Sequence, residues 1–354
     1  TMGNPIFTSL RLQNFRSFED FAVELSPRVN IVVGPNASGK TNLLESLLVV
    51  CGHPSYRTSY DNLIKNDKQW SRMDSHGLDE TRVVKLKIVN DTVIKTYEIN
   101  EKPKKRLAFL ETIPIVLFEP DDMRLLIGPP EVRREYFDSI IAKTSPSFLD
   151  VKSQYKRALA QRNRLLKMPD KLGRQIFAWN VRLSQLAGKL VEERLKLLQG
   201  VNKHLTKTYL RLANSSGELA VGYSTDLDVR SYESSMIKAL EKSAELDLAR
   251  GYTHFGPHRE DYLITIEDKP AEVVASRGET RTLVLSLKLI EIKILEEVRK
   301  QKPAVLLDDV FSELDGFRRQ ALTKYLDDYQ VIITTTDADV IQKNFAQSTN
   351  RISL

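Results

Sequence analysis

The sequence GPNASGKT at residues 34–41 matches the phosphate-loop pattern G-x-x-x-x-G-K-[ST] at every fixed position. A short apolar run over residues 29–33 precedes it, and an apolar segment over residues 42–50 follows it. This order predicts a buried strand, a glycine-rich loop and a helix. Glycine allows such a loop to curl until its N–H groups point at phosphate oxygens, and the helix adds the positive end of its dipole. The stretch therefore predicts a nucleotide site within an α/β fold.

Two side chains of this loop have chemical roles of their own. The Lys40 ammonium is expected to bridge the β- and γ-phosphates of ATP, and the Thr41 hydroxyl is expected to ligate Mg²⁺. The alternative is a chance glycine-rich turn, which the flanking strand and helix disfavour. The residues expected to hold the nucleotide here are Gly34, Pro35, Asn36, Ala37, Ser38, Gly39, Lys40, Thr41 and Asn42.

A second apolar run, over residues 304–307, ends in two carboxylates, Asp308 and Asp309. In a phosphate-loop fold the first is expected to hold Mg²⁺, directly or through water, and the second to orient or activate the attacking water. The alternative is an acidic turn after a core strand, and the phosphate loop favours the functional interpretation. Asp309 and Lys40 are therefore the predicted catalytic residues, with Thr41 and Asp308 as metal ligands.

The spacing of apolar residues predicts how the rest of the chain is organised. Alternation predicts paired strands over 83–89 and 93–99, and helical spacing predominates from about residue 131 to residue 212. A long helix over 280–300 is followed by the strand at 304–307, a helix over 317–328 and a strand over 331–335. Strand, helix and strand joined by short turns imply parallel pairing with a right-handed crossover.

We therefore expect an α/β fold in which a compact helical lobe is inserted into an ATPase lobe. The lobe boundaries are approximate, because they rest on a change from mixed to helical spacing and back. The expected parts are the first part of the ATPase lobe over 1–130, the helical lobe over 131–250, and the second part of the ATPase lobe over 251–354.

The composition is that of an ordinary globular protein, since 41% of the 354 residues are hydrophobic and 28% are charged. The 53 Lys and Arg residues outnumber the 47 Asp and Glu residues, and the resulting charge of +6 permits binding to a polyanion without requiring it. Cys51 is the only cysteine, which excludes an internal disulfide framework and indicates a reducing compartment. No apolar run approaches 18 residues, so we expect a cytoplasmic protein without a membrane span.

A further motif, Ser276-Arg277-Gly278-Glu279, directly precedes the long predicted helix. A serine hydroxyl, backbone N–H groups and a helix N-terminus together form an anion site. A plain N-cap with an acidic first turn is the alternative. The motif lies upstream of Asp308, and residues 312–315 (Ser-Glu-Leu-Asp) follow that aspartate.

The order of these motifs resembles the head of an ABC-type ATPase: phosphate loop, signature S-x-G-[EQ], acidic strand and D-loop. In that superfamily the signature serine of one subunit contacts the γ-phosphate held by the other, so ATP is bound between two heads. The resemblance implies that Ser276, Arg277, Gly278 and Glu279 bind the nucleotide of a second copy. It also implies the fold, an ABC-type head with a mixed sheet.

Further stretches narrow the resemblance within that superfamily, and they run through the chain at 12–18, 34–45, 55–58, 118–122, 128–130, 133–138, 256–261, 276–279 and 307–315. By these stretches the chain resembles the RecF family of recombination mediators. The resemblance implies an ATP-dependent homodimer that binds double-stranded DNA at junctions of single and double strands beside gaps. It further implies work with RecO and RecR to load RecA in DNA replication, repair, recombination and the SOS response, near the nucleoid, and a weak ATPase stimulated by DNA. Arg57 is implied to lie at the nucleotide.

The sequence departs from the ABC pattern at Asp309, where most members carry glutamate. A shorter carboxylate reaches the water less well, so we expect slow hydrolysis. No glutamine or histidine marks the Q-loop and H-loop, and Glu119 or Asp121, and Thr336 or Asp337, occupy roughly those places. For three further residues a site role and a local structural role are both open: Arg57, Arg277 and His258.

Contacts to DNA are expected to be made by basic residues on a turn and on the helical lobe, although charged runs on helices are often only solvated faces. No aromatic residues alternate with them, so contacts to the DNA backbone are expected to dominate over base stacking. The candidates are Lys102, Lys104, Lys105, Arg106, Arg157, Arg162, Arg164, Lys167, Lys171 and Arg174.

Three alternatives to this function stay open at the level of sequence. A small-molecule kinase would use Lys40 and Asp308, but it would have no use for the signature or the D-loop. A scaffold that binds ATP without hydrolysing it would use the same residues. An SMC-like ATPase of a defence system is the third, and it normally carries an additional nuclease module, of which the sequence gives no sign.

Overall fold

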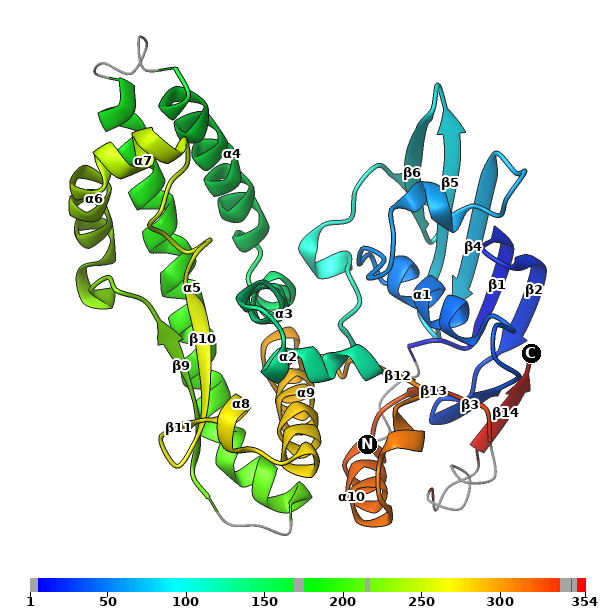
Figure 1. Ribbon diagram of the computed structural model, residues 1–354. Helices are drawn as coiled ribbons and strands as arrows, with labels where there is room; N and C mark the ends of the chain where they lie inside the picture. Colours follow the sequence, from blue (N-terminus) through cyan, green and yellow to red (C-terminus); the bar gives the residue numbers. More distant parts are fainter. Residues whose placement is uncertain (1–5, 169–174, 214–216, 338–344, 346–348) are drawn as a thin grey trace. The chain divides into compact units, whose positions relative to one another are not determined.

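The computed structural model describes residues 6–168, 175–213, 217–337, 345 and 349–354 (Figure 1). The chain packs as two compact units. Unit 1 comprises Thr1–Asp122 with Glu291–Leu354, and unit 2 comprises Met123–Ile290. This division rests on packing alone. The functional lobes expected from the sequence, with boundaries at 130 and 250, stay a prediction.

The centre of unit 1 is a five-stranded sheet in which every recorded pairing is parallel. Its strand order places β13 between β3, which leads into the phosphate loop, and β12, which ends at Asp308. Both β3 and β13 are buried throughout, which explains why apolar residues predominate in them, although β3 contains Asn30 and β13 ends in Thr334 and Thr335. In sheet order the strands are β14 (Thr349–Ser353), β3 (Val29–Val33), β13 (Val331–Thr335), β12 (Ala304–Asp308) and β8 (Ile115–Phe118).

A second sheet of unit 1 has six strands, and its pairings are antiparallel. Helix α1 (Lys40–Val50) contacts strands of both sheets, and for that reason its residues are almost all buried. The α/β class is confirmed, and the parallel and antiparallel strands that were expected in one mixed sheet lie in two separate sheets. The six strands in sheet order are β2 (Phe18–Glu24), β1 (Ser9–Phe15), β4 (Trp70–His76), β5 (Thr81–Val89), β6 (Thr92–Ile99) and β7 (Lys102–Lys104).

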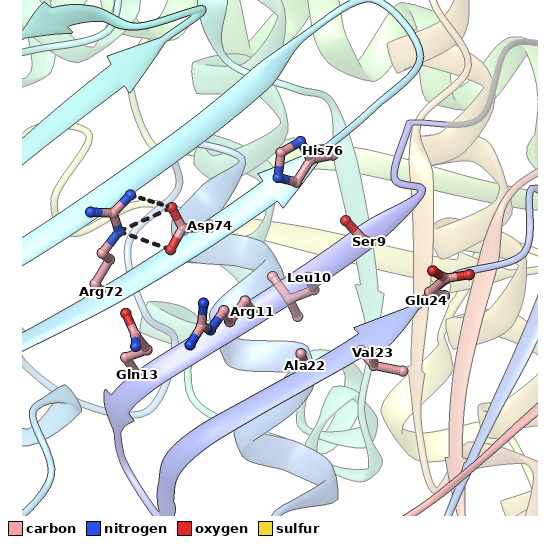
Figure 2. A pocket seen from close by; sticks show the side chains of 10 residues that line it. All are labelled: Ser9, Leu10, Arg11, Gln13, Ala22, Val23, Glu24, Arg72, Asp74 and His76. Carbon is pink, nitrogen blue, oxygen red and sulfur yellow. Dashed lines mark hydrogen bonds and ion pairs between the residues drawn. The ribbon is translucent and has the colours of Figure 1, made fainter.

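The outward face of this six-stranded sheet carries a shallow hollow of about 640 Å³ (Figure 2). Its two arginines are paired: Arg72 donates to Asp74, which also lines the hollow, at 2.7 Å, and Arg11 donates to Asp20, which does not line it, at 2.7 Å. No residue of the phosphate loop lines it. Because exposed pairs of this kind contribute little free energy, we interpret the hollow as a solvated sheet face.

The remaining elements of unit 1 are helices and short 3₁₀ helices. The helix α10 (Gly316–Leu326) begins at Asp315, whose carboxylate accepts from the Arg318 N–H at 2.9 Å as an N-cap. The helix α9 (Arg277–Arg299) contains the boundary between the units, at residue 290. The 3₁₀ helices are η1 (Tyr60–Leu63), η2 (Phe109–Glu111), η3 (Pro120–Met123) and η6 (Val310–Glu313).

Unit 2 is mainly helical, as the spacing over residues 131–212 predicts, and it also contains a three-stranded antiparallel sheet, of which the apolar spacing over residues 263–266 predicts only one strand. The helices are α2 (Arg124–Ile127), α3 (Pro130–Thr144), α4 (Phe148–Leu166), α5 (Gln175–Leu212), α6 (Tyr232–Lys242), α7 (Ala244–Arg250) and α8 (Ala271–Val274), with the 3₁₀ helix η5 (Val229–Ser231). In sheet order the strands are β11 (Lys269–Pro270), β10 (Asp261–Ile266) and β9 (Leu219–Ser224).

The interior of unit 2 holds ion pairs as well as apolar side chains. Arg194 donates two hydrogen bonds to the carboxylate of Asp138, and both side chains are buried. Burial by itself raises the pKa of Asp138, but the charges and hydrogen bonds of Arg194 and Lys152 lower it below the usual value. Below the lowered pKa this carboxylate binds a proton and the stabilisation is lost, so the pair stabilises unit 2 most at neutral pH.

Arg162 forms a second buried pair, with Asp247 at 2.7 Å, and its side chain is 1% exposed. It also donates to Asn180 and Thr253. The expectation that Arg162 contacts DNA is therefore wrong, because reaching a phosphate would break a buried ion pair and take from Asp247 the arginine that balances it.

Candidate nucleotide site

The phosphate loop connects β3 to α1, as the sequence predicts, and its conformation requires glycine at one position. Gly39 is the N-cap of α1, with φ of 106°. A Cβ atom there would lie 2.8 Å from Ser17 Oγ and 3.0 Å from Phe18 Cζ, so a side chain would be strained and would collide. Ala37 also has a positive φ, 66°, which is costly for a residue with a Cβ and which occurs most often at functional loops.

The remaining loop residues form an exposed rim and a narrow base. Pro35, Asn36 and Ala37 are exposed. At the base, a Cβ on Gly34 would lie 2.6 Å from Ser38 Oγ. That hydroxyl is buried and makes no hydrogen bond to any of the described residues. A buried hydroxyl without a partner is costly, so Ser38 fits a loop that is completed by a polar ligand.

Lys40 turns back over this loop. Its ammonium donates to Gly34 O and to Pro35 O, each at 2.8 Å, and the residue is 9% exposed. The positive charge is thus held inside the curl of the backbone and at the start of α1, where an anion is favoured. Lys40 is placed as a phosphate ligand requires.

Thr41 and Asp308, the two predicted metal ligands, come together although 267 residues separate them. The Thr41 hydroxyl donates to Asp308 Oδ1 at 3.1 Å. On the other side, the Tyr56 hydroxyl donates to Asp308 Oδ2 at 3.4 Å. One carboxylate and one hydroxyl, both oxygen donors, suit Mg²⁺, which prefers few protein ligands together with phosphate oxygens. The donor set therefore fits the ion.

Asp309 follows with a left-handed backbone, φ 53°, and is the N-cap of η6. Its carboxylate Oδ1 is buried and accepts no hydrogen bond from the described part of the chain. An unpaired buried carboxylate oxygen beside the metal ligand has the properties required of an acceptor for a proton from water. The geometry is consistent with the role predicted for Asp309.

Arg57 and Asn42 extend the site beyond the loop. The exposed Arg57 guanidinium lies 3.5 Å from the side-chain oxygen of Asn42, which follows Thr41 on α1. The segment that carries Arg57 is fixed at Ser55, whose hydroxyl accepts from the N–H groups of Arg57 and Thr58, each at 3.1 Å. The structure therefore brings Arg57 to the phosphate loop.

Glu45 anchors this segment, and sequence reasoning missed its role. The Glu45 side chain is fully buried and accepts two hydrogen bonds from Arg16, at 2.9 and 3.0 Å. The Ser55 hydroxyl donates to the same carboxylate. A glutamate within an otherwise apolar helix sequence was the available signal, because a buried carboxylate needs a partner.

The signature residues lie in unit 2 and form a capping box. Ser276 Oγ accepts from the Glu279 N–H at 3.3 Å, and the Glu279 carboxylate accepts from the Ser276 N–H at 2.9 Å. The hydrogen bond from Ser276 lowers the pKa of Glu279. Ser276 and Arg277 are exposed, with Gly278 between solvent and core. Ser276 therefore acts as the N-cap of the helix, which was the alternative to an anion site, and its side chain stays at the surface.

The other motif residues are placed locally. Ser312 of the D-loop donates to Asp309 O at 2.7 Å. The Glu119 N–H donates to the Asp122 carboxylate at 2.9 Å, and the Asp337 N–H donates to the Thr335 hydroxyl at 3.1 Å. These contacts assign no Q-loop or H-loop role, and those equivalences stay predictions.

His258 belongs to the interior of unit 2. Its Nδ1 lies 2.7 Å from the Tyr155 hydroxyl and its Nε2 lies 3.3 Å from Thr253 O. Burial lowers the pKa of His258 to about 4, so the ring is neutral at physiological pH. Because Nε2 faces a carbonyl, it carries the proton, and Nδ1 accepts from tyrosine. His258 is a structural residue in this unit.

Among the described residues, no helix is long and apolar enough to cross a membrane. Over the same residues, no group of three or more His, Cys, Asp or Glu side chains could hold a metal ion by itself. A metal at Asp308 would therefore need further oxygen ligands from the nucleotide or from water.

A family model described as the RecF/RecN/SMC N terminal domain matches residues 6–353. The DNA replication and repair protein RecF of Heliobacterium modesticaldum is 33% identical over 340 residues, covering 93% of this chain and 91% of that protein. The RecF of Bacillus subtilis is 31% identical over 346 residues, covering 94% of each.

Two solved structures of the recombination mediator protein RecF in the RecFOR pathway are also similar, each with 27% identity. RecF-ATPrS has a TM-score of 0.87 and covers 99% of this chain and 97% of its own. RecF-ATP has a TM-score of 0.85, with 95% and 93% covered. An Smc head bound to the C-winged helix domain of ScpA has a TM-score of 0.56 at 16% identity over 96% and 92%, a likeness of fold alone. The expected ABC-type head is confirmed.

Proposed function

The chain belongs to the RecF/RecN/SMC family and, within it, to the RecF proteins, and from that premise we propose that it is an ATP-dependent, DNA-binding recombination mediator. The observation that carries the proposal is the meeting of Thr41 and Asp308 beside Lys40, at the base of a loop that only glycine can close. ATP, with Mg²⁺, supplies a triphosphate whose terminal bond is cleaved by water.

In this proposal the residues of unit 1 bind and orient the nucleotide. The N–H groups of the loop and the Lys40 ammonium hold phosphate oxygens, and Arg57 lies beside them. Thr41 and Asp308 hold the metal, and Asp309 accepts the proton of the attacking water. Turnover is slow, because an aspartate at this position reaches less far than a glutamate.

The signature residues act in trans. Ser276 lies at the surface at the start of a 23-residue helix, where its hydroxyl and the helix dipole favour an anion. We propose that Ser276, Arg277, Gly278 and Glu279 of one copy complete the phosphate site of a second copy. The dimer is then stable only while the triphosphate is bound, so that nucleotide and DNA binding are linked.

Double-stranded DNA at the edge of a single-strand gap is the proposed ligand of the dimer. RecO and RecR are the proposed partners, loading of RecA is the proposed outcome, and the cytoplasm, at the nucleoid, is the proposed location. The solved relatives are described in the RecFOR pathway, which supports this assignment. A small-molecule kinase is the second candidate in principle, but no observation on the signature or the D-loop favours it.

Replacing Asp309 with asparagine is expected to leave ATP binding within about twofold and to lower the rate of phosphate release by roughly 100-fold, the usual contribution of a positioned general base. The amide keeps the size of the side chain but cannot accept the proton of water. Fluorescent ATP titration and a phosphate-release assay measure the two effects. An unchanged rate would remove Asp309 from the mechanism.

Binding to duplex DNA is expected to weaken by roughly 100-fold or more between about 50 and 200 mM salt, because contacts to phosphates release counterions. The exposed Lys105 and Arg106 are the sharper test, with the exposed Lys196, already paired with Glu192, as control. Lys105→Gln with Arg106→Gln is expected to flatten the salt dependence measured by fluorescence anisotropy, and Lys196→Gln to leave it unchanged. Affinity that barely changes with salt would contradict contacts to the DNA backbone.

Arg157, Arg164 and Lys167 are exposed and stay candidates for the same role, whereas Lys104 is paired with Glu111. Lys102 is exposed at the edge of the six-stranded sheet. Two further candidates, Lys171 and Arg174, lie outside the described residues.

A further inference from the structure

Thr334 makes a pair of hydrogen bonds that no motif predicts. It lies on β13, the strand between the phosphate-loop strand β3 and the acidic strand β12 (Figure 1). In the register of these strands, Thr334 is paired with Val32 on one side and with Asp308 on the other. The threonine is 0% exposed, so its hydroxyl has no access to bulk water.

The hydroxyl of Thr334 connects both acidic residues of the site. Its Oγ1 donates to Asp308 Oδ1 at 2.7 Å and accepts from the Asp309 N–H at 3.0 Å. A more distant contact, 3.4 Å, joins it to Leu307 O. A hydroxyl has one proton, and the short distance to a carboxylate, which only accepts, assigns that proton to the bond with Asp308.

The two hydrogen bonds have different consequences. The bond to Asp308, together with the bond from Thr41, fixes the orientation of the carboxylate that is expected to face the metal. The bond from the Asp309 N–H holds a residue whose left-handed φ of 53° costs free energy and directs its side chain. Partners that orient a metal ligand commonly change metal affinity or activity by about 10- to 100-fold when they are removed.

We propose that Thr334 is a positioning residue. It orients Asp308 toward the metal and Asp309 toward the attacking water, and it contacts neither the metal nor the water itself. This inference rests on the proposed ATPase function of the same site. β13 is therefore more than a central strand, because the Thr334 hydroxyl hydrogen-bonds to both acids, to the side chain of Asp308 and to the backbone of Asp309.

The test compares Thr334→Val, which keeps the shape and removes the hydroxyl, with Thr334→Ser, which keeps the hydroxyl. Thr335→Val is the matched control, because Thr335 is the next residue of the strand, is also buried, and bonds to Asp337 instead of the acids. Three quantities are measured for each variant: kcat and KM for ATP, the Mg²⁺ concentration for half-maximal turnover, and binding of Mn²⁺ by paramagnetic resonance in the presence of a non-hydrolysed ATP analogue.

Thr334→Val is expected to lower kcat by about 10- to 100-fold, to raise the Mg²⁺ requirement several-fold and to weaken Mn²⁺ binding, while ATP binding without metal stays within about threefold. Thr334→Ser is expected to restore all three. If the valine variant does not fold, Thr334→Cys, a weaker donor of similar size, is expected to show the same changes in smaller measure.

Several outcomes would overturn the inference. Wild-type kcat and Mg²⁺ requirement in a folded Thr334→Val or Thr334→Cys protein would show that the hydroxyl is not needed. An equal loss in Thr335→Val, or no rescue by serine, would indicate a general effect on the strand. If the wild-type protein neither binds nor hydrolyses ATP, the proposed function fails first, and this result is distinct from all of these.

Discussion

Replacing Lys40 with alanine is expected to weaken ATP binding by roughly 100-fold. The ammonium is held by Gly34 O and Pro35 O at 2.8 Å, inside the loop, and it is the only side-chain cation placed there by the described contacts. When ATP binds, the Lys40 ammonium is expected to donate its hydrogen bonds to phosphate oxygens instead of these carbonyls, so that charged acceptors replace neutral ones. Two charge-assisted hydrogen bonds, each contributing about 1.5 kcal/mol, correspond to a change of that size.

Titration with a fluorescent ATP analogue measures this effect, and thermal unfolding verifies that the variant is folded. Lys65→Ala is the control, because Lys65 is a lysine of the same unit whose pair with Glu19 lies at the surface. Its affinity for ATP is expected to equal that of the wild type. Lys40→Arg is also expected to fail, since a planar guanidinium doesn't fit a space closed around an ammonium. Tight binding by Lys40→Ala would refute the assignment of the loop.

Replacing Ser276 with arginine is expected to abolish ATP-dependent dimerisation while each monomer still binds ATP. In the proposed dimer this serine faces the triphosphate held by the other copy, and a long side chain has no room there. The wild-type protein is expected to shift from monomer to dimer on addition of ATP and Mg²⁺. Analytical ultracentrifugation with and without the nucleotide measures the shift.

The capping box makes a second variant necessary. Ser276→Arg also loses the N-cap of α9, at a cost of about 1 kcal/mol, which could by itself disturb the helix. Ser276→Asp keeps a good N-cap and adds a negative charge, so it is expected to unfold like the wild type and yet to stay monomeric with ATP. Ser231→Arg, at an exposed serine before α6, is expected to dimerise normally. Dimerisation of Ser276→Asp would contradict the role in trans.

Local patterns were sufficient to predict the phosphate loop and the acidic strand. Residues 34–41 and 304–309 each carry their chemistry in consecutive positions, and the buried strands that lead into them are mainly apolar. The strands β8 and β14 were not predicted: β8 is an apolar run of only four residues, and β14 has a single buried residue, Ile352. Short strands are defined by the neighbours with which they pair, and the sequence does not contain that information in one place.

For the same reason, local patterns did not predict the roles of side chains whose partners lie far away in the sequence. Thr334 resembles its neighbours Thr335 and Thr336 in sequence, and only the register with Asp308 distinguishes it. The basic run on α4 shows the opposite case. Its spacing suggested a solvated or DNA-binding face, but Arg162 points inward, because Asp247, 85 positions later, provides a buried partner.

The parallel sheet has a consequence for the order in which the protein matures. The strand between β3 and β12 is β13, which ends at Thr335, so the phosphate loop and the acids are joined by a strand that follows both of them in the sequence. During translation the loop therefore leaves the ribosome first, the two acids follow, and β13 comes after them. We expect a nascent chain to acquire the ability to hold a nucleotide only once β13 has been made.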